Sequence, residues 1–356
     1  MNPPVTVLMT VYNALPYLSE AIESILGQTF KEFEFLIIDD ASTDGSEERI
    51  RSYHDNRIRF LPNEKNLGTA GSMNRGIAEA RAPIIMRMDH DDVSMPSRLE
   101  HQLAYLDRYS EVAAVCSWEH TIDEKGRIMR SWRAEIKNRG EFFGPLLLGL
   151  CPIWHPSLMV RIEALRSIGG FRESSWPAED FDVTMRLALA GYGAAIVPEF
   201  LLLQRQHQRR QSIQSEEKQR SATARLHTAV IAQCCPNLER AAELAAFLRC
   251  EKPLRGIARS KEEALAFLEM FEHTVKRFAT TLQFSASEQD RMRKILRRRL
   301  GFGPSFGLRH RRLPAWLWFF CFDVTSPLLH PRLRERLALW YRVFWKLRHP
   351  RQFFVR

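Results

Sequence analysis

Acidic side chains gather at three places in this chain, and the first of them indicates a metal site. Asp89 and Asp91 belong to the tetrad DHDD, which closes an apolar run at residues 83–88. Carboxylates this close repel one another, so a bound cation is the simplest counter-charge. Mg²⁺ and Mn²⁺ both take carboxylate and phosphate oxygens as ligands, and either ion would suit this tetrad. A solvated acidic loop that caps the next helix is the competing interpretation.

The second acidic place follows the apolar run FEFLII and suits a nucleotide base. Asp39 or Asp40 can accept a hydrogen bond from the imide N–H of uracil. At the end of the first apolar run, Thr10 offers backbone groups and Tyr12 offers a ring for stacking. The alternative is that this segment only makes an Asx-turn before the next helix, a role expected of Asp44 in either case.

The third acidic place and a basic segment lie further along the chain. Glu179 and Asp180 open a predicted helix, where the helix dipole favours carboxylates even without a function. Placed beside a sugar donor, one of them could take the proton of an acceptor hydroxyl. Arg205 and His207 follow the last predicted core strand, and either could reach a pyrophosphate or a metal, although a lone histidine is more often structural.

The elements that must position these residues alternate between strand and helix over the first 120 residues. Apolar runs predict strands at residues 5–10, 33–38, 58–61, 83–88 and 112–116. Helical patterns fall between them, at residues 17–27, 46–53, 71–80 and 96–109. Repeated β-α units of this length imply a parallel, doubly wound sheet with helices on both faces. Ligands bind at the carboxyl ends of strands in such sheets, which is where the first two acidic places lie.

The second half of the chain predicts a mixture of elements. Strands are expected at residues 156–160 and 194–197, and helices at 162–168 and 179–190. Beyond about residue 214 the pattern is helical to the end. The six cysteines form no C-x-x-C pair, so neither a zinc site nor a disulfide framework is indicated, and a reducing, cytoplasmic setting is expected. No signal peptide is expected either.

The net charge of +10 comes from the end of the chain. The stretch from residue 291 to 356 holds 17 of the 52 Lys and Arg residues but only two of the 42 acids. Its apolar run LPAWLWFFCF is too short to span a bilayer. Residues 308–356 therefore predict a basic amphipathic helix on an anionic membrane surface, with a helix packed on the rest of the chain as the alternative. No nucleic-acid-binding motif accompanies these basic residues, so nucleic acid is not an expected partner.

Five ordered segments together resemble the family 2 glycosyltransferases, which invert the anomeric carbon and have the GT-A fold. They span roughly residues 4–213 and read VTVLMTVYNALPYLSEAIESILGQTF, FLIIDDASTDGS, NEKNLGTAGSMNRGIAEARAPIIMRMDHDD, GGFRE with WPAEDFDVTMRLALAGY, and RQHQRRQS. The resemblance implies an α/β, Rossmann-like mixed sheet of the GT-A, nucleotide-diphospho-sugar transferase type, in a catalytic domain at 1–213. Residues 214–356 would form a basic, helical C-terminal region.

The resemblance also implies roles for the matched residues. The nucleotide site would be formed by Thr10, Tyr12, Asp39, Asp40, Asn74, Arg75 and Asp89. Asp91 would ligate the metal that bridges the diphosphate, with His207 as a second candidate ligand. Asp180 would be the general base, and Glu179 would orient the acceptor.

The activity implied is inverting transfer of a sugar, usually from a UDP donor with Mn²⁺ or Mg²⁺, to a glycan or lipid-linked acceptor at the inner face of the cell membrane. The Q-x-x-R-W pentapeptide of processive synthases is not present in the matching loop, which favours the addition of one or a few sugars. A non-catalytic module that binds nucleotide or glycan on the same fold is the alternative. A nucleotidyltransferase is disfavoured because YNALP, not a Gly-rich loop, follows the first strand.

Overall fold

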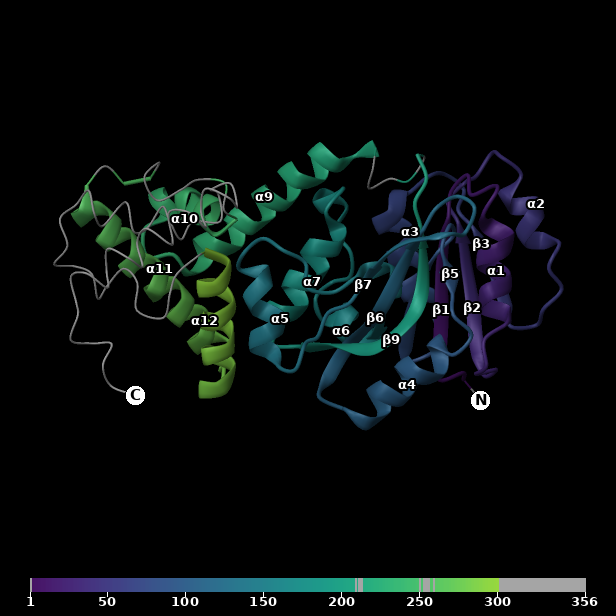
Figure 1. Ribbon diagram of the computed structural model, residues 1–356. Helices are drawn as coiled ribbons and strands as arrows, with labels where there is room; N and C mark the ends of the chain where they lie inside the picture. Colours follow the sequence, from purple (N-terminus) through teal and green to yellow (C-terminus); the bar gives the residue numbers. More distant parts are fainter. Residues whose placement is uncertain are drawn as a thin grey trace. The chain divides into compact units, whose positions relative to one another are not determined.

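The chain forms two compact units, and all of the candidate site residues lie in the first. The computed structural model describes residues 2–208, 210, 214–249, 251, 257–258 and 260–300. Unit 1 comprises Met1–Phe142 and Cys151–Thr223, and unit 2 comprises Phe143–Leu150 and the described residues from Ala224 onward (Figure 1). The amphipathic helix expected in residues 308–356 lies outside the described residues.

Unit 1 is built on one nine-stranded sheet with the strand order β3-β2-β1-β4-β8-β6-β9-β5, and β7 pairs with β6 beside this path. Its strands are β1 Val5–Val11, β2 Phe33–Asp39, β3 Ile58–Pro62, β4 Ile84–Asp89, β5 Val93–Ser94, β6 Val112–Ile122, β7 Ile128–Trp132, β8 Met159–Arg161 and β9 Gly193–Arg205.

The parallel sheet predicted from the β-α repeats is present only on one side. The strands β3, β2, β1 and β4 are parallel neighbours, so the ends of β1, β2 and β4 lie along one edge. On the other side β8 runs antiparallel to both β4 and β6, and β5 runs antiparallel to β9. The expectation of a wholly parallel sheet is therefore wrong, whereas the mixed sheet implied by the family resemblance is confirmed.

Helices cover both faces of this sheet. They are α1 Leu18–Leu26, α2 Ser46–Arg51, α3 Gly68–Glu79, α4 Arg98–Arg108, α6 Ile162–Ser167 and α7 Glu179–Leu189. The helix α5 Arg139–Leu146 is divided between the two units. Apolar residues of α1 and α4 share a core with Val7 and Met9 of β1. Because alternate residues of a strand face opposite ways, Leu8 points to the other face, where it meets Gly76 of α3.

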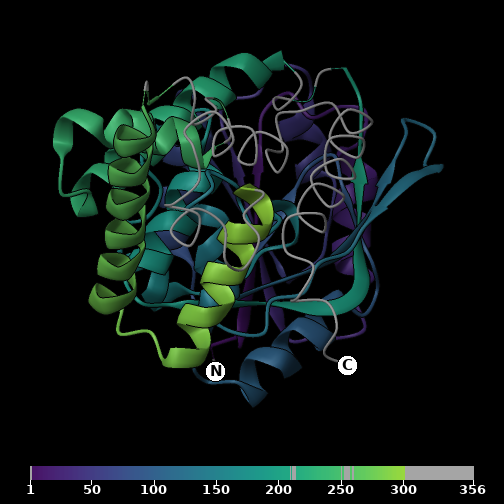
Figure 2. The same cartoon turned by 60° about the vertical axis from the view of Figure 1, so that its left-hand side comes forward.

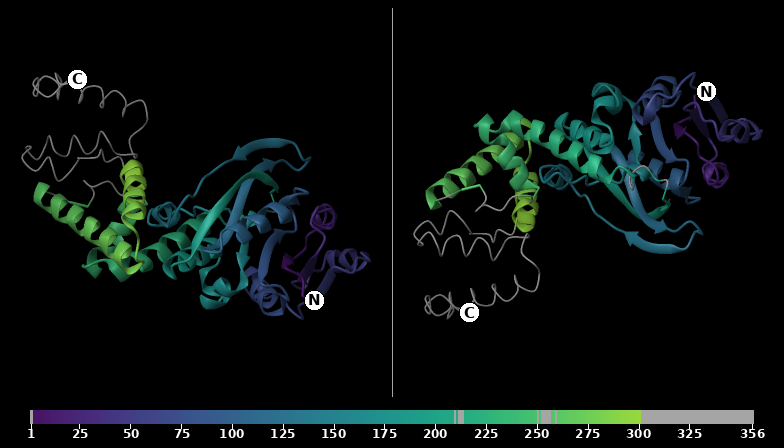
Figure 3. Two further views of the ribbon diagram at one scale, coloured as in Figure 1. Left: turned by 90° about the horizontal axis from the view of Figure 1, so that it is seen from below. Right: turned by 90° about the horizontal axis from the view of Figure 1, so that it is seen from above.

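The strands β6 and β9 are much longer than the strands predicted at residues 112–116 and 194–197. β6 and β9 are parallel neighbours along most of their length, and β9 curves strongly in Figures 2 and 3. The apolar patterns ended early because the later parts of both strands bury polar residues, among them Glu119 and Gln204. The strand predicted at 156–160 begins instead with a 3-10 turn, His155–Ser157, and only then continues as β8.

Unit 2 is helical in its described part, as predicted for the region beyond residue 214. Its helices include α10 Ala241–Leu248, α11 Lys261–Thr281 and α12 Ala286–Leu300, while α9 Glu216–Cys234 begins in unit 1. The side-chain oxygen of Ser260 accepts a hydrogen bond from the Glu263 N–H and so caps α11. Phenylalanine rings, including Phe143 against Phe278, fill its core. None of the helices in the described part of the chain is long and apolar enough to cross a membrane.

The close contact of α3 with β1 gives a first testable prediction. A Cβ built on Gly76 would lie 2.3 Å from a methyl carbon of Leu8, which is fully buried. We expect Gly76→Ala to lower the free energy of unfolding by about 1–3 kcal/mol, as overpacking does in well-packed cores. Urea denaturation measures the loss. In the double variant Leu8→Val/Gly76→Ala, part of the loss should be recovered, and strict additivity would contradict the proposed clash.

Candidate active site

The acidic tetrad at the end of β4 forms a compact cluster of carboxylates. One oxygen from each of Asp89, Asp91 and Asp92 lies within 4.8 Å of the others. Asp91 and Asp92 are buried, and Asp89 is partly exposed. His90, which lies between Asp89 and Asp91 in the sequence, contacts β1, because its Nδ1 lies 3.2 Å from the Thr10 carbonyl oxygen. The carboxylates therefore stand at a fixed place on the carboxyl edge of the sheet.

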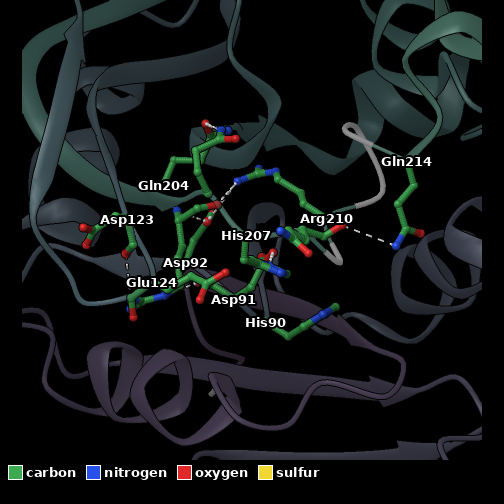
Figure 4. A network of polar contacts seen from close by, with 12 residues as sticks. His90, Asp91, Asp92, Asp123, Glu124, Gln204, His207, Arg210 and Gln214 are labelled. Atoms are coloured by element: carbon green, nitrogen blue, oxygen red, sulfur yellow. Dashed lines mark hydrogen bonds and ion pairs between the residues drawn. The ribbon is translucent and has the colours of Figure 1, made fainter.

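The end of β9 and the segment after it supply the partners of this cluster (Figure 4). His207 Nε2 lies 2.9 Å from Asp91 Oδ2, and Arg210 Nη1 lies 3.6 Å from Asp92 Oδ1. The backbone N–H of Arg205 donates to the same oxygen of Asp92 at 2.8 Å. More than 110 residues of sequence separate the two segments, and the antiparallel pairing of β5 with β9 brings them together.

The two buried aspartates differ in their protonation. Burial opposes ionisation of Asp91, but the hydrogen bond from His207 and the charges of His90 and Arg210 hold its pKa well below the usual value. Asp92 is more deeply buried and faces the negative charge of Asp91, so its pKa is raised well above the usual value despite Arg210. One oxygen of Asp92 has no hydrogen-bond partner. Asp91 is therefore the carboxylate of this pair that stays charged.

The residues present fit a divalent cation. Asp91 supplies a charged oxygen, and His207 supplies an imidazole nitrogen 2.9 Å from it, which is close enough for both atoms to face one ion. Asp89 adds a further carboxylate within the same cluster. Hard cations such as Mg²⁺ and Mn²⁺ take carboxylate ligands, and imidazole is a common metal ligand. These observations support the metal-binding pair predicted from the sequence without identifying the ion.

Arg205 holds the loop of His207 in place. Its buried guanidinium donates to the Asp91 carbonyl at 3.2 Å and to the Glu20 carboxylate at 2.6 Å. It also lies over the ring of Tyr17, which in turn contacts the His207 ring at 5.0 Å between centroids. The Arg205 side chain is therefore engaged by a backbone carbonyl and by Glu20, and of the two basic side chains it is His207 that contacts a carboxylate of the acidic cluster.

Glu179 and Asp180 lie at the start of α7, close to Arg87 of β4. Burial raises the pKa of both carboxyl groups above its usual value, while the positive charge of Arg87 opposes the rise. Arg87 also makes an ion pair with Asp89 at 2.9 Å, so it links the helix start to the acidic cluster. Asp180 accepts a hydrogen bond from the Phe181 N–H at 2.7 Å, and one oxygen of Glu179 is buried without a partner.

Two further polar residues, His155 and Cys151, contact α7 through the Thr184 hydroxyl. His155 is buried, and its Nε2 lies 3.0 Å from the Thr184 hydroxyl, one turn after Asp180. Burial lowers the pKa of His155 to about 3, so its ring is neutral. The Cys151 thiol donates toward the same hydroxyl at 3.5 Å. Sequence patterns did not single out His155, because nothing in its local spacing distinguishes it.

The residues predicted for the nucleotide lie at the ends of β1 and β2. Tyr12 is 49% exposed just beyond β1, as a stacking ring would need to be. Asp39 is buried and accepts hydrogen bonds from the Ser42 hydroxyl and N–H. Asp40 binds the side chain of Asn63 and the backbone N–H groups of residues 67 and 68. Asp40 therefore also connects β2 to the loop before α3.

Two other expected residues and the helix-capping residue are engaged in protein contacts. Asn74 exchanges two hydrogen bonds of 2.8 Å with the backbone of Phe171, and so ties α3 to the Gly-Gly-Phe turn. Arg75 donates to the Pro62 carbonyl and to the side chain of Asn63. Asp44 accepts from the Ser46 N–H at 3.0 Å, which confirms its expected Asx-turn.

The structure adds three charged residues that sequence reasoning missed, namely Arg87, Glu119 and Arg210. The two arginines lie in segments that the motifs cover, but a lone arginine carries no recognisable spacing. Glu119 lies on β6 with both carboxylate oxygens buried and without partners. Burial raises its pKa to about 8, against the opposing charges of Arg210 and Arg98. In the sequence it follows an apolar run as one of several polar residues, so no pattern distinguishes it.

Comparisons with known proteins agree with this arrangement. A family model described as Glycosyl transferase family 2 matches residues 6–169. An uncharacterized glycosyltransferase of Methanocaldococcus jannaschii is 36% identical over 56% of this chain and 70% of its own length. The putative glycosyltransferase EpsE of Bacillus subtilis is 31% identical over 71% of this chain and 88% of its own length.

Two solved structures share the fold at low sequence identity. Residues 1–349 of TarS from S. aureus, in complex with UDP-GlcNAc, align with a TM-score of 0.53 and 17% identity, over 82% of this chain and 90% of TarS 1–349. The mannosyltransferase PcManGT from Pyrobaculum calidifontis, in complex with GDP-Man and Mn²⁺, aligns with a TM-score of 0.50 and 18% identity, over 83% of this chain and 85% of that one.

The Glu119 carboxyl, which has no hydrogen-bond partner, gives a prediction for how the free energy of unfolding depends on pH. Its pKa of about 8 in the folded chain lies above the value of about 4.3 expected when unfolded, so folding takes up a proton between these pH values. Stability should therefore fall as pH rises from about 5 to 8, by up to about 1.4 kcal/mol per pH unit from this group. Urea denaturation of the native chain and of Glu119→Gln isolates the effect. If the free energy of unfolding changes with pH in the same way in both proteins, the raised pKa of Glu119 is contradicted.

Proposed function

This chain belongs to the family 2 glycosyltransferases and has the GT-A fold, and we propose that it moves a sugar from a UDP donor to a glycan or lipid-linked acceptor hydroxyl. Glycosyl transfer follows from the family. The finer assignment is supported by one observation above all, the contact of Asp91 with His207 in the acidic cluster. Arg87 connects this cluster to Asp180, because it pairs with Asp89 and its charge acts on the Asp180 carboxyl.

In this proposal the donor lies along the carboxyl edge of the sheet. The nucleotide site comprises Thr10, Tyr12, Asp39, Asp40, Asn74, Arg75 and Asp89. Tyr12 stacks on the uracil ring, Asp39 accepts a hydrogen bond from its imide N–H and Asp89 binds the ribose. Asn74 and Arg75 border the site through the loops that they hold at Phe171 and Asn63.

Asp91 and His207 would hold the Mn²⁺ or Mg²⁺ ion that serves the diphosphate. When bound, such an ion neutralises the charge that builds up on the departing diphosphate. Arg205 keeps His207 in position through its bonds to Asp91 and Glu20. The low pKa of Asp91 suits this role, because a metal ligand must be deprotonated.

Asp180 is the general base and Glu179 orients the acceptor. Asp180 accepts the acceptor's proton as that oxygen forms a bond to the anomeric carbon, and the bond from that carbon to the diphosphate oxygen breaks. A single displacement of this kind inverts the anomeric carbon. Burial raises the pKa of Asp180, which makes this carboxylate a stronger base. The positive charge of Arg87 limits the rise in this pKa.

Asp180→Asn tests the catalytic part of the proposal. The purified chain is mixed with Mn²⁺ and UDP-glucose, UDP-galactose or UDP-N-acetylglucosamine, and release of UDP to water is measured. We expect Asp180→Asn to lower the release rate by about 10²–10⁴-fold, the usual contribution of a general base, and to leave donor affinity within about threefold. Glu163→Gln, an exposed acid on α6, is the matched control and should behave like the native chain.

The outcomes separate the alternatives. An Asp180→Asn variant that releases UDP at the native rate would contradict its role as base. Donor binding without release by the native chain, even with added membrane extract as a source of acceptors, would favour the non-catalytic binding module.

A further inference from the structure

The hairpin formed by β6 and β7 presents two different faces. Glu119 and Trp132 are direct cross-strand partners, so their side chains lie on the same face. The alternate residues Trp118 and His120 lie on the opposite face, where both rings contact Phe200.

Trp132 meets a second tryptophan from the segment before β8. The ring centroids of Trp132 and Trp154 are 5.2 Å apart and their planes are tilted by 36°. Both residues are only half-buried, so indole surface remains in contact with water. Exposure of apolar surface to water is unfavourable, so two adjacent half-exposed indoles indicate a binding site for a ligand with an apolar surface.

Contacts of Trp154 and its neighbour place this pair between the metal loop and the proposed base. With the Gln204 amide oriented to suit its neighbours, its oxygen accepts from Trp154 Nε1 and from Arg210, each at 2.9 Å. Arg210 in turn faces Asp92 of the acidic cluster. On the other side, His155 contacts Thr184 on α7, the helix that begins with the proposed base.

The same face offers polar groups that would receive hydroxyls. Both oxygens of Glu119, directly across from Trp132, are buried without a hydrogen-bond partner, which is a costly arrangement unless a ligand or water supplies donors. Arg130, two residues before Trp132, adds hydrogen-bond donors beside it and bonds to the Thr121 hydroxyl. An apolar surface with a carboxyl group and guanidinium donors at its edge matches a sugar ring, which has an apolar face and a rim of hydroxyls.

We propose that Trp132 and Trp154 form the subsite that binds a pyranose ring of the acceptor. This inference rests on the proposed function, because a glycan acceptor is part of it. A sugar ring stacked there would present its hydroxyls to the space between α7 and the acidic cluster. The predicted nucleotide site is at the ends of β1 and β2, so the tryptophan pair is not needed for the donor's base.

The test follows the indole N–H signals of the chain's eight tryptophans by NMR, after labelling with ¹⁵N-tryptophan. Trp132→Phe and Trp154→Phe assign the two relevant signals. Methyl glycosides of glucose, galactose, mannose and N-acetylglucosamine are added separately, up to about 50 mM because single sugars bind weakly. The protein is kept saturated with UDP and Mg²⁺.

We expect at least one glycoside to shift the signals of Trp132 and Trp154 saturably and to leave Trp118, on the opposite face, unmoved. Trp132→Ala should weaken this binding about tenfold or more, as loss of a central aromatic contact does. Met129→Ala, an exposed residue at the irregular part of β7, is the control and should bind as the native chain does.

Three results would overturn the subsite. The first is that none of the glycosides shifts the two signals, and the second is that Trp132→Ala binds them with native affinity. The third is that uridine, and not a glycoside, shifts them, since that would make the pair a nucleobase site. UDP binding is measured separately by calorimetry, so failure of the donor site is distinguishable from failure of the subsite.

Discussion

The site depends on one contact, between the carboxylate of Asp91 and the imidazole of His207. It joins the end of β4 to the segment after β9, and these strands are separated in the sheet by β8 and β6. A wholly parallel sheet of repeated β-α units would not bring the segment after β9 back to the end of β4. The antiparallel strand β8, the long strand β9 and the two-residue strand β5 make the contact possible.

The carboxyl groups proposed as metal ligand and as general base have pKa values that are shifted in opposite directions. Asp91 is kept charged by His207 and nearby cations, whereas burial raises the pKa of Asp180. Pairs of acids whose environments shift their pKa values in opposite directions are a common basis for dividing roles in catalysis. Arg87 lies between the two places, since it makes an ion pair with Asp89 and opposes the rise at Asp180. The arrangement allows a charged ligand group and a basic carboxyl to coexist.

Much of the fold could be predicted from the sequence because the first half of unit 1 follows local rules. Apolar runs ended at acidic residues, and helices with one apolar face followed them, so β1, β2 and β4 were expected with Asp39 and Asp89 at their ends. β5 and β7 could not be predicted, because two or five residues on an exposed hairpin or at a sheet edge carry too little pattern. β6 was underestimated because its later half buries Glu119, which reads as a strand end.

For the site itself, motif order identified residues but not their partners. That His207 would reach Asp91, and that Arg205 would hold the loop, depends on strand pairing over more than 110 residues. Arg210 and His155 act through buried contacts with Asp92 and Thr184, and a single sequence gives no sign of such contacts. The roles implied by the family resemblance remain proposals, and the geometry supplies the reasons to test them.

The most direct test of the central claim is calorimetric titration of UDP into the native chain and into Asp91→Asn, with Mn²⁺ and then with EDTA. The exposed Asp107→Asn is the control. The account predicts binding that needs the metal and is weakened about 100-fold or more in Asp91→Asn, because the ion would lose its charged ligand. Absence of nucleoside diphosphate binding with metal present, or binding that neither EDTA nor Asp91→Asn changes, would contradict it.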